Sequence, residues 1–346
     1  MFYLNHFKES IKWRGVKVNN NIKHILYKIG YPQTLIENSN NSHVIIAYHG
    51  VVDKIRDPII DTWCVTTEEL FKQISVLQKY FDIVTLKRLI EIIKKQESTD
   101  KPVAVITFDD AYEGVYLNAY PILKEKNIPF LVCFPSGLIG TSEIIWAVGI
   151  DLIIKLSMLK EVIIPSYMGQ PEITFPLKNI EQRISASFKI ERLSLNIGGD
   201  YGLNIFYNLI EQCGLDNYKN LLKEYSHFKI MSIPQAQEMV ANGVEPAVHG
   251  RFHLPLNTTD DLILGSEIVE SRKELSAKLN VNTVDHFCLC HGAFNSKSMY
   301  LIKQSGYKSC LTYVEHRRVK LSDSPYNLCR IEGNCTTEDL IWSIIK

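Results

Sequence analysis

The stretch VAVITFDDAYEG, residues 103–114, places a run of β-prone residues directly before two acids, Asp109 and Asp110. Neighbouring side chains on a regular strand point to opposite faces, so both carboxylates can serve one site only if the strand has already ended. The pair is therefore predicted at the carboxyl end of the strand, where α/β folds and barrels carry their active sites. A helix cap would account for one of these acids, but not for both.

Apolar runs and amphipathic stretches alternate on both sides of this strand. Upstream and just downstream, strands are predicted over residues 43–52, 82–85, 102–108 and 128–137, and helices over 66–81, 86–96 and 112–127. Further on, the pattern predicts strands over 244–252, 284–290 and 309–314, and helices over 232–243, 259–280 and 296–306. Such alternation indicates a parallel sheet that is buried on both faces.

The alternation stops in the middle of the chain, where longer helical patterns predominate and few strands are evident. A chain of 346 residues is within the range of one α/β barrel that carries an insertion. We therefore divide it into an N-terminal segment and linker (1–42), a first barrel part (43–140), a mostly helical insertion (141–233) and a second barrel part (234–346).

Composition and charge limit the class of protein. Hydrophobic residues make up 46% and charged residues 22%, as in ordinary globular proteins. The formal net charge is zero, so no general attraction to a nucleic acid polymer is expected. Eight cysteines without a CxxC pair fit reduced thiols. Cys288 and Cys290 are two residues apart, which suits alternate positions of a buried strand better than a zinc site.

The N-terminal segment bears on location. Basic residues interrupt its apolar stretches, unlike a secretory signal, and no later segment is apolar over the length of a spanning helix. We therefore expect a cytoplasmic protein. The mixture of aromatic and basic residues also suits peripheral contact with the inner face of the membrane, although a helix packed on its own domain explains the same pattern.

A second group of chemically capable residues follows the strand predicted at 244–252. In AVHGRFHLPL, His249 and His253 are four residues apart, a spacing that brings two imidazoles to one face of a helical turn. Neutral imidazole is a preferred ligand of zinc and related ions. A lone HxxxH is weak evidence, and surface or capping histidines would give the same pattern. A third strand end, in VDHFCLCHGAFN, adds His291 and Gly292.

Together these stretches resemble the polysaccharide deacetylases with a NodB-homology domain, which are metal-dependent carbohydrate esterases. TFDDAYEG is similar to the family's first motif, HGRFH to its histidine motif, and FCLCHGAF occupies the place of its third. The resemblance extends over most of residues 43–140 and 230–332 and leaves out the insertion. It implies a distorted (β/α) barrel.

The resemblance also implies roles for individual residues. Asp109 matches the catalytic base, and the metal ligands match Asp110, His249 and His253. One carboxylate and two imidazoles leave positions open for water and substrate, as a catalytic metal site requires. Zn²⁺ is the expected ion, and Co²⁺, Ni²⁺ or Mn²⁺ suit the same ligands. A backbone N–H near His291 or Gly292 is placed to stabilise an oxyanion.

The chain departs from the family pattern at two places. Cys288, Cys290 and His291 replace an arginine, a proline and a tyrosine of the third motif, and the leucine-histidine motif, whose histidine protonates the leaving amine, has no clear copy. The candidates for that acid are His49, His291 and His316, and His49 lies at the tip of the first strand. Arg330 with Glu332 matches an Arg-Ile position common in the family, to which we assign no role.

The sequence is compatible with three functions. The first is a metal-dependent hydrolase that removes an N-acyl group, most simply acetyl, from an amino sugar or glycan precursor of cell-surface polysaccharide. Tyr112, Trp63 and Trp146 are candidates to bind the sugar, although large aromatics are more often part of the core. The second is a non-catalytic carbohydrate-binding or scaffold protein of the same fold. The third is a deformylase or another deacylase.

Overall fold

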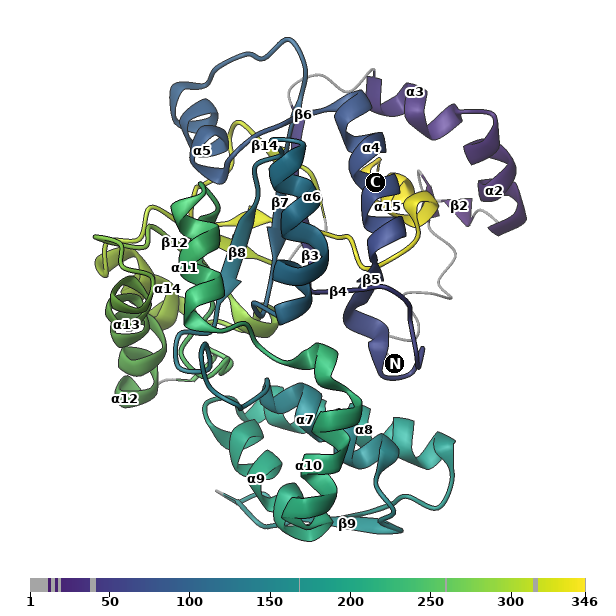
Figure 1. The fold of residues 1–346 in the computed structure, drawn as a ribbon, viewed down its shortest axis with the longest axis vertical. Coiled ribbons are helices and arrows are strands. Elements are labelled where there is room, and N and C mark those ends of the chain that lie inside the picture. Colours follow the sequence, from purple (N-terminus) through teal and green to yellow (C-terminus); the bar gives the residue numbers. More distant parts are fainter. Residues whose placement is uncertain are drawn as a thin grey trace.

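The computed structural model describes residues 12–13, 16–17, 20–37, 42–167, 169–258, 260–313 and 317–345. Its centre is a nearly closed barrel of parallel strands, with helices around it and a separate group of helices at one end (Figure 1). The consecutive barrel strands are β3 (Ser42–Tyr48), β7 (Val103–Phe108), β8 (Leu131–Phe134), β11 (Glu245–Val248), β12 (His286–Cys288) and β13 (Ser309–Thr312). The distorted (β/α) barrel expected from the sequence is confirmed.

One short segment closes the barrel. β15 (Leu328–Cys329) pairs in parallel with β13, and β16 (Ile331–Glu332) pairs in parallel with β3. Arg330 lies between these two strands and is fully buried. Two short strands pair with the amino-terminal residues of ring strands: β6 (Asp82–Ile83) runs parallel to β7, and β14 (Val319–Lys320) runs antiparallel to β3.

Helices surround the barrel, and polar caps set where several of them begin. The Thr66 side chain accepts the Glu69 N–H at the start of α4, and Ser232 and Gln235 form a capping box at α11. The surrounding helices are α2 (Asn20–Lys28), α3 (Tyr31–Glu37), α4 (Thr67–Tyr80), α5 (Leu86–Lys95), α6 (Tyr120–Glu125), α11 (Ile233–Ala241), α12 (Asp261–Leu264), α13 (Ser271–Lys278), α14 (Ser296–Gln304) and α15 (Thr337–Ile344). Turns of π-helix, Val115–Ala119 and Gly265–Glu270, precede α6 and α13.

α5 closes the amino end of the barrel. Its N-terminal amides, those of Leu86 and Lys87, donate to the carboxylate of Glu245, the first residue of β11. Its apolar face joins a buried cluster with inward-facing strand residues, including Ile45, Val105, Leu131, Cys133, Ala247, Cys288, Leu311 and Leu328. The opposite, carboxyl end of the strands is therefore the end left for a site.

The helical segment stands at that carboxyl end, at the bottom of Figure 1. It contains α7 (Trp146–Leu156), α8 (Ile180–Ile197), α9 (Tyr201–Cys213), α10 (Leu215–Glu224) and the antiparallel hairpin of β9 (Glu161–Ile164) and β10 (Ile173–Pro176). The chain enters and leaves it side by side, because the Gly140 N–H donates to the Met231 carbonyl at 3.3 Å. The domain boundaries at 141 and 233 stay a prediction.

A contact between two side chains attaches this segment to the strand ends. Nε2 of His227, in the turn Ser226–Phe228, lies 2.8 Å from Oδ1 of Asp61, in the turn Asp61–Trp63. That turn joins β4 (Gly50–Val52) to β5 (Cys64–Thr66) through the loop after β3. The helical segment is thus positioned against the first loop of the barrel.

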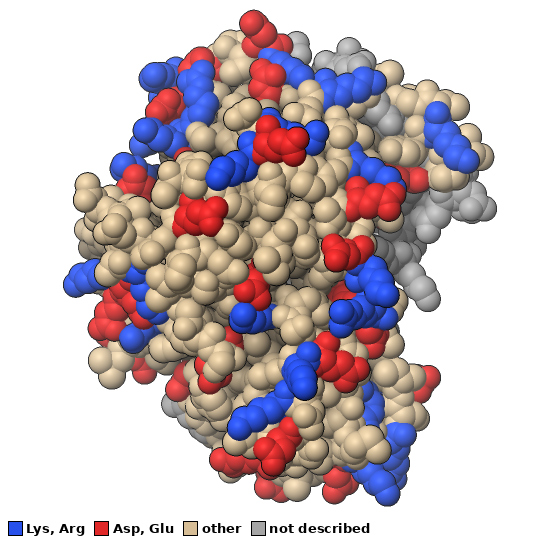
Figure 2. Space-filling model, viewed as in Figure 1, with Lys and Arg blue, Asp and Glu red and all other residues tan. Residues whose placement is uncertain are grey.

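Most of residues 1–19 lie outside the described residues, so the contact of this stretch with a membrane stays a prediction. Only the hairpin strands β1 (Lys12–Trp13) and β2 (Val16–Lys17) are described before α2. Within the described part of the chain, no helix combines the length and apolar character needed to cross a bilayer. On the face shown in Figure 2, acidic and basic side chains are interspersed.

Candidate active site

A sharp turn after β7 brings the paired acids together. Asp110 and Ala111 have left-handed backbones, with φ of 65° and 52°, and the Met231 N–H supports the turn by donating to the Ala111 carbonyl at 2.9 Å. The turn breaks the strand's alternation. As a result Asp109 Oδ2 lies 3.9 Å, and Asp110 Oδ1 lies 3.4 Å, from the same atom, Nε2 of His249.

Asp110, His249 and His253, the predicted metal ligands, converge on one point. Asp110 Oδ1 lies 3.4 Å from Nε2 of His249 and 3.2 Å from Nε2 of His253, and none of the described residues donates a hydrogen bond of regular geometry to this buried oxygen. The two imidazole rings meet edge to face with centroids 4.7 Å apart. A buried carboxylate oxygen facing two imidazole nitrogens fits a divalent cation.

The tautomer of His249 supports that fit. Its Nδ1 lies 2.9 Å from the Cys288 carbonyl oxygen, which can only accept, so Nδ1 must carry the hydrogen. In the neutral ring, Nε2 then presents a lone pair to Asp110 Oδ1. Two lone pairs in contact repel each other unless a cation, either a metal ion or a proton, lies between them. A carbonyl that fixes the tautomer of a histidine is the usual partner of a metal ligand.

The loop between the two histidines is not the helical turn that we expected, and that expectation was wrong. Gly250 and His253 both have left-handed backbones, with φ of 68° and 59°. The carboxylate of Glu267 shapes this loop by accepting the N–H groups of Arg251 at 2.9 Å, Phe252 at 3.0 Å and Leu254 at 3.2 Å. Glycine is required at 250, because a side-chain carbon there would overlap the Glu267 carboxylate.

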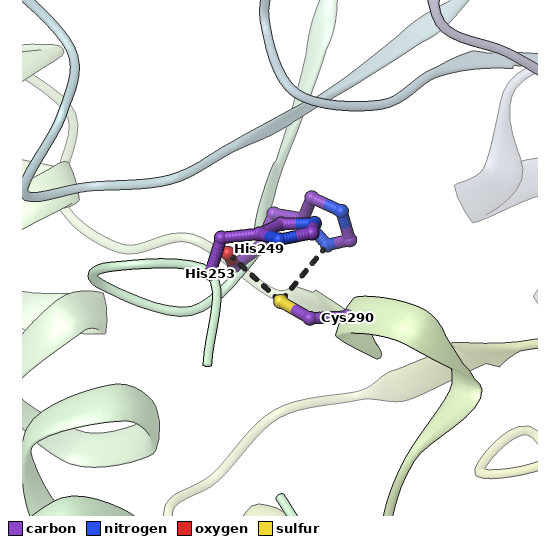
Figure 3. Close-up of side chains that lie close together, drawn as sticks. All are labelled: His249, His253 and Cys290. Atoms are coloured by element: carbon purple, nitrogen blue, oxygen red, sulfur yellow. Dashed lines mark hydrogen bonds between the residues drawn. The ribbon is translucent and has the colours of Figure 1, made fainter. Parts of the chain in front are cut away.

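Cys290 offers a different ligand group with the same histidines (Figure 3). Its Sγ lies 3.7 Å from Nδ1 of His249, and both dashed lines from Cys290 in Figure 3 lead to that residue. Nδ1 is already committed to the Cys288 carbonyl, and burial raises the pKa of the Cys290 thiol to about 12. We therefore favour Asp110 over Cys290 as the third ligand.

Arg330 holds the predicted base, a role that the sequence did not reveal. Its Nη1 and Nη2 donate to Oδ1 and Oδ2 of Asp109 at 2.7 and 2.8 Å, and both side chains are buried. Burial alone would raise the pKa of Asp109, but Arg330, with His249, brings it well below its ordinary value. The signal was present: a lone arginine within the buried strand of NLCRIEGN requires a buried acid as its partner.

His49 faces the same carboxylate from the end of β3. Its Nε2 lies 3.9 Å from Asp109 Oδ2, and its Nδ1 lies 3.1 Å from Oδ1 of Asn334. Asn334 donates its own amide to the Trp63 carbonyl, which assigns Oδ1 to the His49 side and makes Nδ1 a donor. Burial lowers the pKa of His49, but the charges of Glu332, Asp109 and Asp110 outweigh it, so the pKa is raised.

The other predicted acids are placed differently. The His291 ring contacts the rings of His253 and Trp146, with centroids 4.6 and 5.2 Å away, and its buried Nε2 has no hydrogen-bond partner in the part of the chain that the structure describes. Burial, reinforced by His253, lowers the pKa of His291 well below its ordinary value, which keeps the ring neutral. His49 is thus the better proton donor of the two. His316 lies outside the described residues.

The predicted sugar-binding side chains are mostly inside the protein. Trp146 and Tyr112 are each 1% exposed, so neither presents a face on which a sugar ring could stack, and this correction follows from their packing in the core. Trp146 instead donates its Nε1–H to the His253 carbonyl at 2.9 Å. The backbone at Gly292 is left-handed, with φ of 63°. Its role beside an oxyanion stays a prediction.

The site therefore combines an ionised carboxylate, a carboxylate with two imidazoles, and a histidine of raised pKa at the carboxyl end of a (β/α) barrel. This arrangement is suited to hydrolysis assisted by a metal ion.

Comparison with known proteins shows what this chain is similar to. A family model described as polysaccharide deacetylase matches residues 96–157 and 216–310, ranges that reach into the helical segment as far as α7 and α10 and leave out its middle. The deacetylase PplD of Streptococcus pyogenes, solved with acetate, superposes with a TM-score of 0.55 at 15% identity, over 88% of this chain and 99% of its own. IcaB from Ammonifex degensii gives 0.52 at 16%, over 85% and 92%. No curated protein matches the chain in sequence. The resemblance to the polysaccharide deacetylases with a NodB-type fold is confirmed.

Proposed function

We propose that this protein is a metal-dependent hydrolase that removes an N-acetyl group from an amino sugar or glycan precursor. One observation carries the proposal: the buried Asp110 Oδ1 faces Nε2 of His249 and of His253 at 3.4 and 3.2 Å, beside an ionised Asp109. The family match supports an acetylated saccharide as the substrate.

Asp110, His249 and His253 would hold the ion, with Zn²⁺ first and Co²⁺, Ni²⁺ or Mn²⁺ as alternatives. A bound divalent ion would supply Lewis-acid polarisation of the acyl carbonyl and of the attacking water. Asp109 accepts the proton of that water at Oδ2. Arg330 keeps the carboxylate ionised and fixes its orientation through both oxygens.

His49 supplies the proton for the leaving group in this proposal. As the amide C–N bond breaks, the nitrogen needs a proton to depart as an amine. Nε2 of His49 lies 3.9 Å from Asp109 Oδ2, so both proton-handling atoms border the same space. The raised pKa of His49 favours the protonated ring that this step requires. We infer a role in cell-surface glycan synthesis, which the match to polysaccharide deacetylases supports. We also infer a cytoplasmic reaction at the inner face of the membrane, since aromatic residues mixed with basic ones, as in residues 2–17, suit contact with an anionic membrane face.

A second candidate is a carbohydrate-binding protein that retains the fold without turnover. It is favoured by the strength of the Arg330 pair, because a carboxylate held by two hydrogen bonds and with a strongly lowered pKa is a weak base. The two candidates share the metal site and differ in whether Asp109 can take a proton.

The test measures release of acetate and amine from N-acetylated sugars, nucleotide-sugars and lipid-linked sugars, with Zn²⁺ or Co²⁺ added. Wild-type protein should release both products in equal amounts, and Asp109→Asn should release neither while still binding Co²⁺. If the wild type binds Co²⁺ and sugar but releases no product, the binding protein becomes the better description. A wild type that binds no metal would exclude the proposed site.

A further inference from the structure

A small cavity lies between the helical segment and the turn before β5. Its volume is about 50 Å³, and its walls are aromatic and acidic rather than purely apolar. The lining of the cavity includes Trp63, Trp146, Phe228, Asp151, Ser187 and Glu191. A cavity of this volume holds a few water-sized groups, such as an amino group with its carbon, but no sugar ring.

The cavity shares its tryptophan walls with the candidate active site. The Trp63 ring lies 4.9 Å from the ring of His49, and the Trp146 ring lies 5.2 Å from that of His291, between centroids. A group inside the cavity is therefore one aromatic ring away from the histidines at the strand ends. That separation suits a substituent on a neighbouring sugar unit, while the reacting acetamide occupies the metal site.

The positive charge of Lys155 only partly offsets the two carboxylates at the cavity. Asp151 is satisfied, because Lys155 Nζ lies 2.7 Å from its Oδ2 and the Ser187 hydroxyl donates to its Oδ1. Glu191, one turn after Ser187 on α8, makes no hydrogen bond or ion pair with the rest of the described chain. Burial, followed by the charge of Asp151, raises the pKa of Glu191 to about 7. A cation in the cavity would offset the free-energy cost of keeping the Glu191 carboxylate charged.

We propose that this cavity binds the protonated amino group of an amino-sugar unit next to the unit whose acetamide is hydrolysed. Aromatic faces attract cations, and the Glu191 carboxylate supplies the ion pair. The inference rests on the proposed function and narrows its substrate to partly deacetylated saccharides. Both Asp151 and Glu191 belong to the helical segment, which would thereby contribute to binding of the substrate.

The first test compares disaccharides of N-acetylglucosamine whose second unit carries either an acetamide or a free amine, in both orders of linkage. Wild-type protein should show a kcat/KM for acetate release about 10-fold higher with the free amine, through a lower KM. Glu191→Gln should bring the two values within about twofold of each other. Glu181→Gln, an exposed residue on the same helix, should keep the wild-type preference.

The second test needs no turnover. The tryptophan fluorescence of the Asp109→Asn variant is titrated with glucosamine and, separately, with N-acetylglucosamine. Adding Glu191→Gln to this variant should abolish the binding of glucosamine and leave that of N-acetylglucosamine unchanged. Superimposable unfolding curves confirm that each variant is folded. Equal kcat/KM values for the two disaccharides, with no glucosamine-specific binding, would overturn the amine site and leave the proposed reaction intact. Glucosamine binding that depends on Glu191, without acetate release from any substrate, would support the amine site and reject the reaction.

Discussion

Replacing Arg330 by methionine should destabilise this protein strongly, although the side chain keeps a similar volume. The change removes hydrogen bonds of 2.7 and 2.8 Å to Asp109 and leaves that carboxylate buried, at 1% exposure. Two hydrogen bonds to charged groups contribute about 1.5–3 kcal/mol each, and breaking a buried ion pair costs about 3–5 kcal/mol. Nε2 of His49 and Nε2 of His249 each lie 3.9 Å from Asp109 Oδ2, so these rings can partly replace the lost positive charge. We therefore expect a loss of about 3 kcal/mol in the free energy of unfolding.

The assay is urea unfolding at pH 7 in the presence of a chelator, which separates the ion pair from any bound metal. The pKa of Asp109 is lower in the folded protein than its unfolded value of about 3.9, so the stabilisation is present above that value and is lost as the pH falls through the folded pKa. At pH 7 it is fully present. The double variant Arg330→Met with Asp109→Asn should lose much less than the two single variants summed, because no unpaired charge remains.

The matched control is Arg88→Met. Arg88 also donates through Nη1 and Nη2 to both carboxylate oxygens of one acid, Glu97, but this pair is partly exposed to solvent. Water and salt screen it, so the loss should be much smaller than at Arg330. A coupling energy below about 0.5 kcal/mol between Arg330 and Asp109 in the double-mutant cycle would refute the reasoning.

Three further predictions concern the metal and the acid. Glu267→Gln should weaken Co²⁺ binding about 10- to 100-fold, because the Glu267 carboxylate shapes the loop between His249 and His253. Binding is measured by Co²⁺ absorption under conditions where the variant is fully folded. Glu270→Gln, at an exposed position, should bind Co²⁺ as the wild type does. His49→Gln should lower kcat by about 10²–10⁴-fold. Because the pKa of His49 is raised, wild-type kcat should fall as the pH rises through that pKa, and a variant retaining this alkaline limb would exclude His49 as the acid. Zn²⁺ at 100 times its Kd should stabilise the fold by about 2.7 kcal/mol, and Asp110→Asn should abolish that shift in thermal unfolding.

Local patterns were sufficient to predict the architecture. Strands such as β7 and β8 are continuous apolar runs, and helices such as α4 and α11 begin at capping residues, so their order along the chain predicts a barrel. The position of the acids directly after β7 also followed from the period of a strand. These features depend on residues within a few positions of one another, and for that reason the sequence displays them.

From the sequence we could predict the barrel and three chemical groups at strand ends, Asp109 with Asp110, His249 with His253, and His49. Which of these groups meet depends on the tertiary structure. Arg330 is 221 residues from Asp109, and pairing of its segment with both β13 and β3 places it inside the barrel. The left-handed loop of His253 depends on the distant carboxylate of Glu267, and burial of Trp146 depends on the packing of α7. Contacts between distant segments carry no local period, so no pattern along the chain reports them.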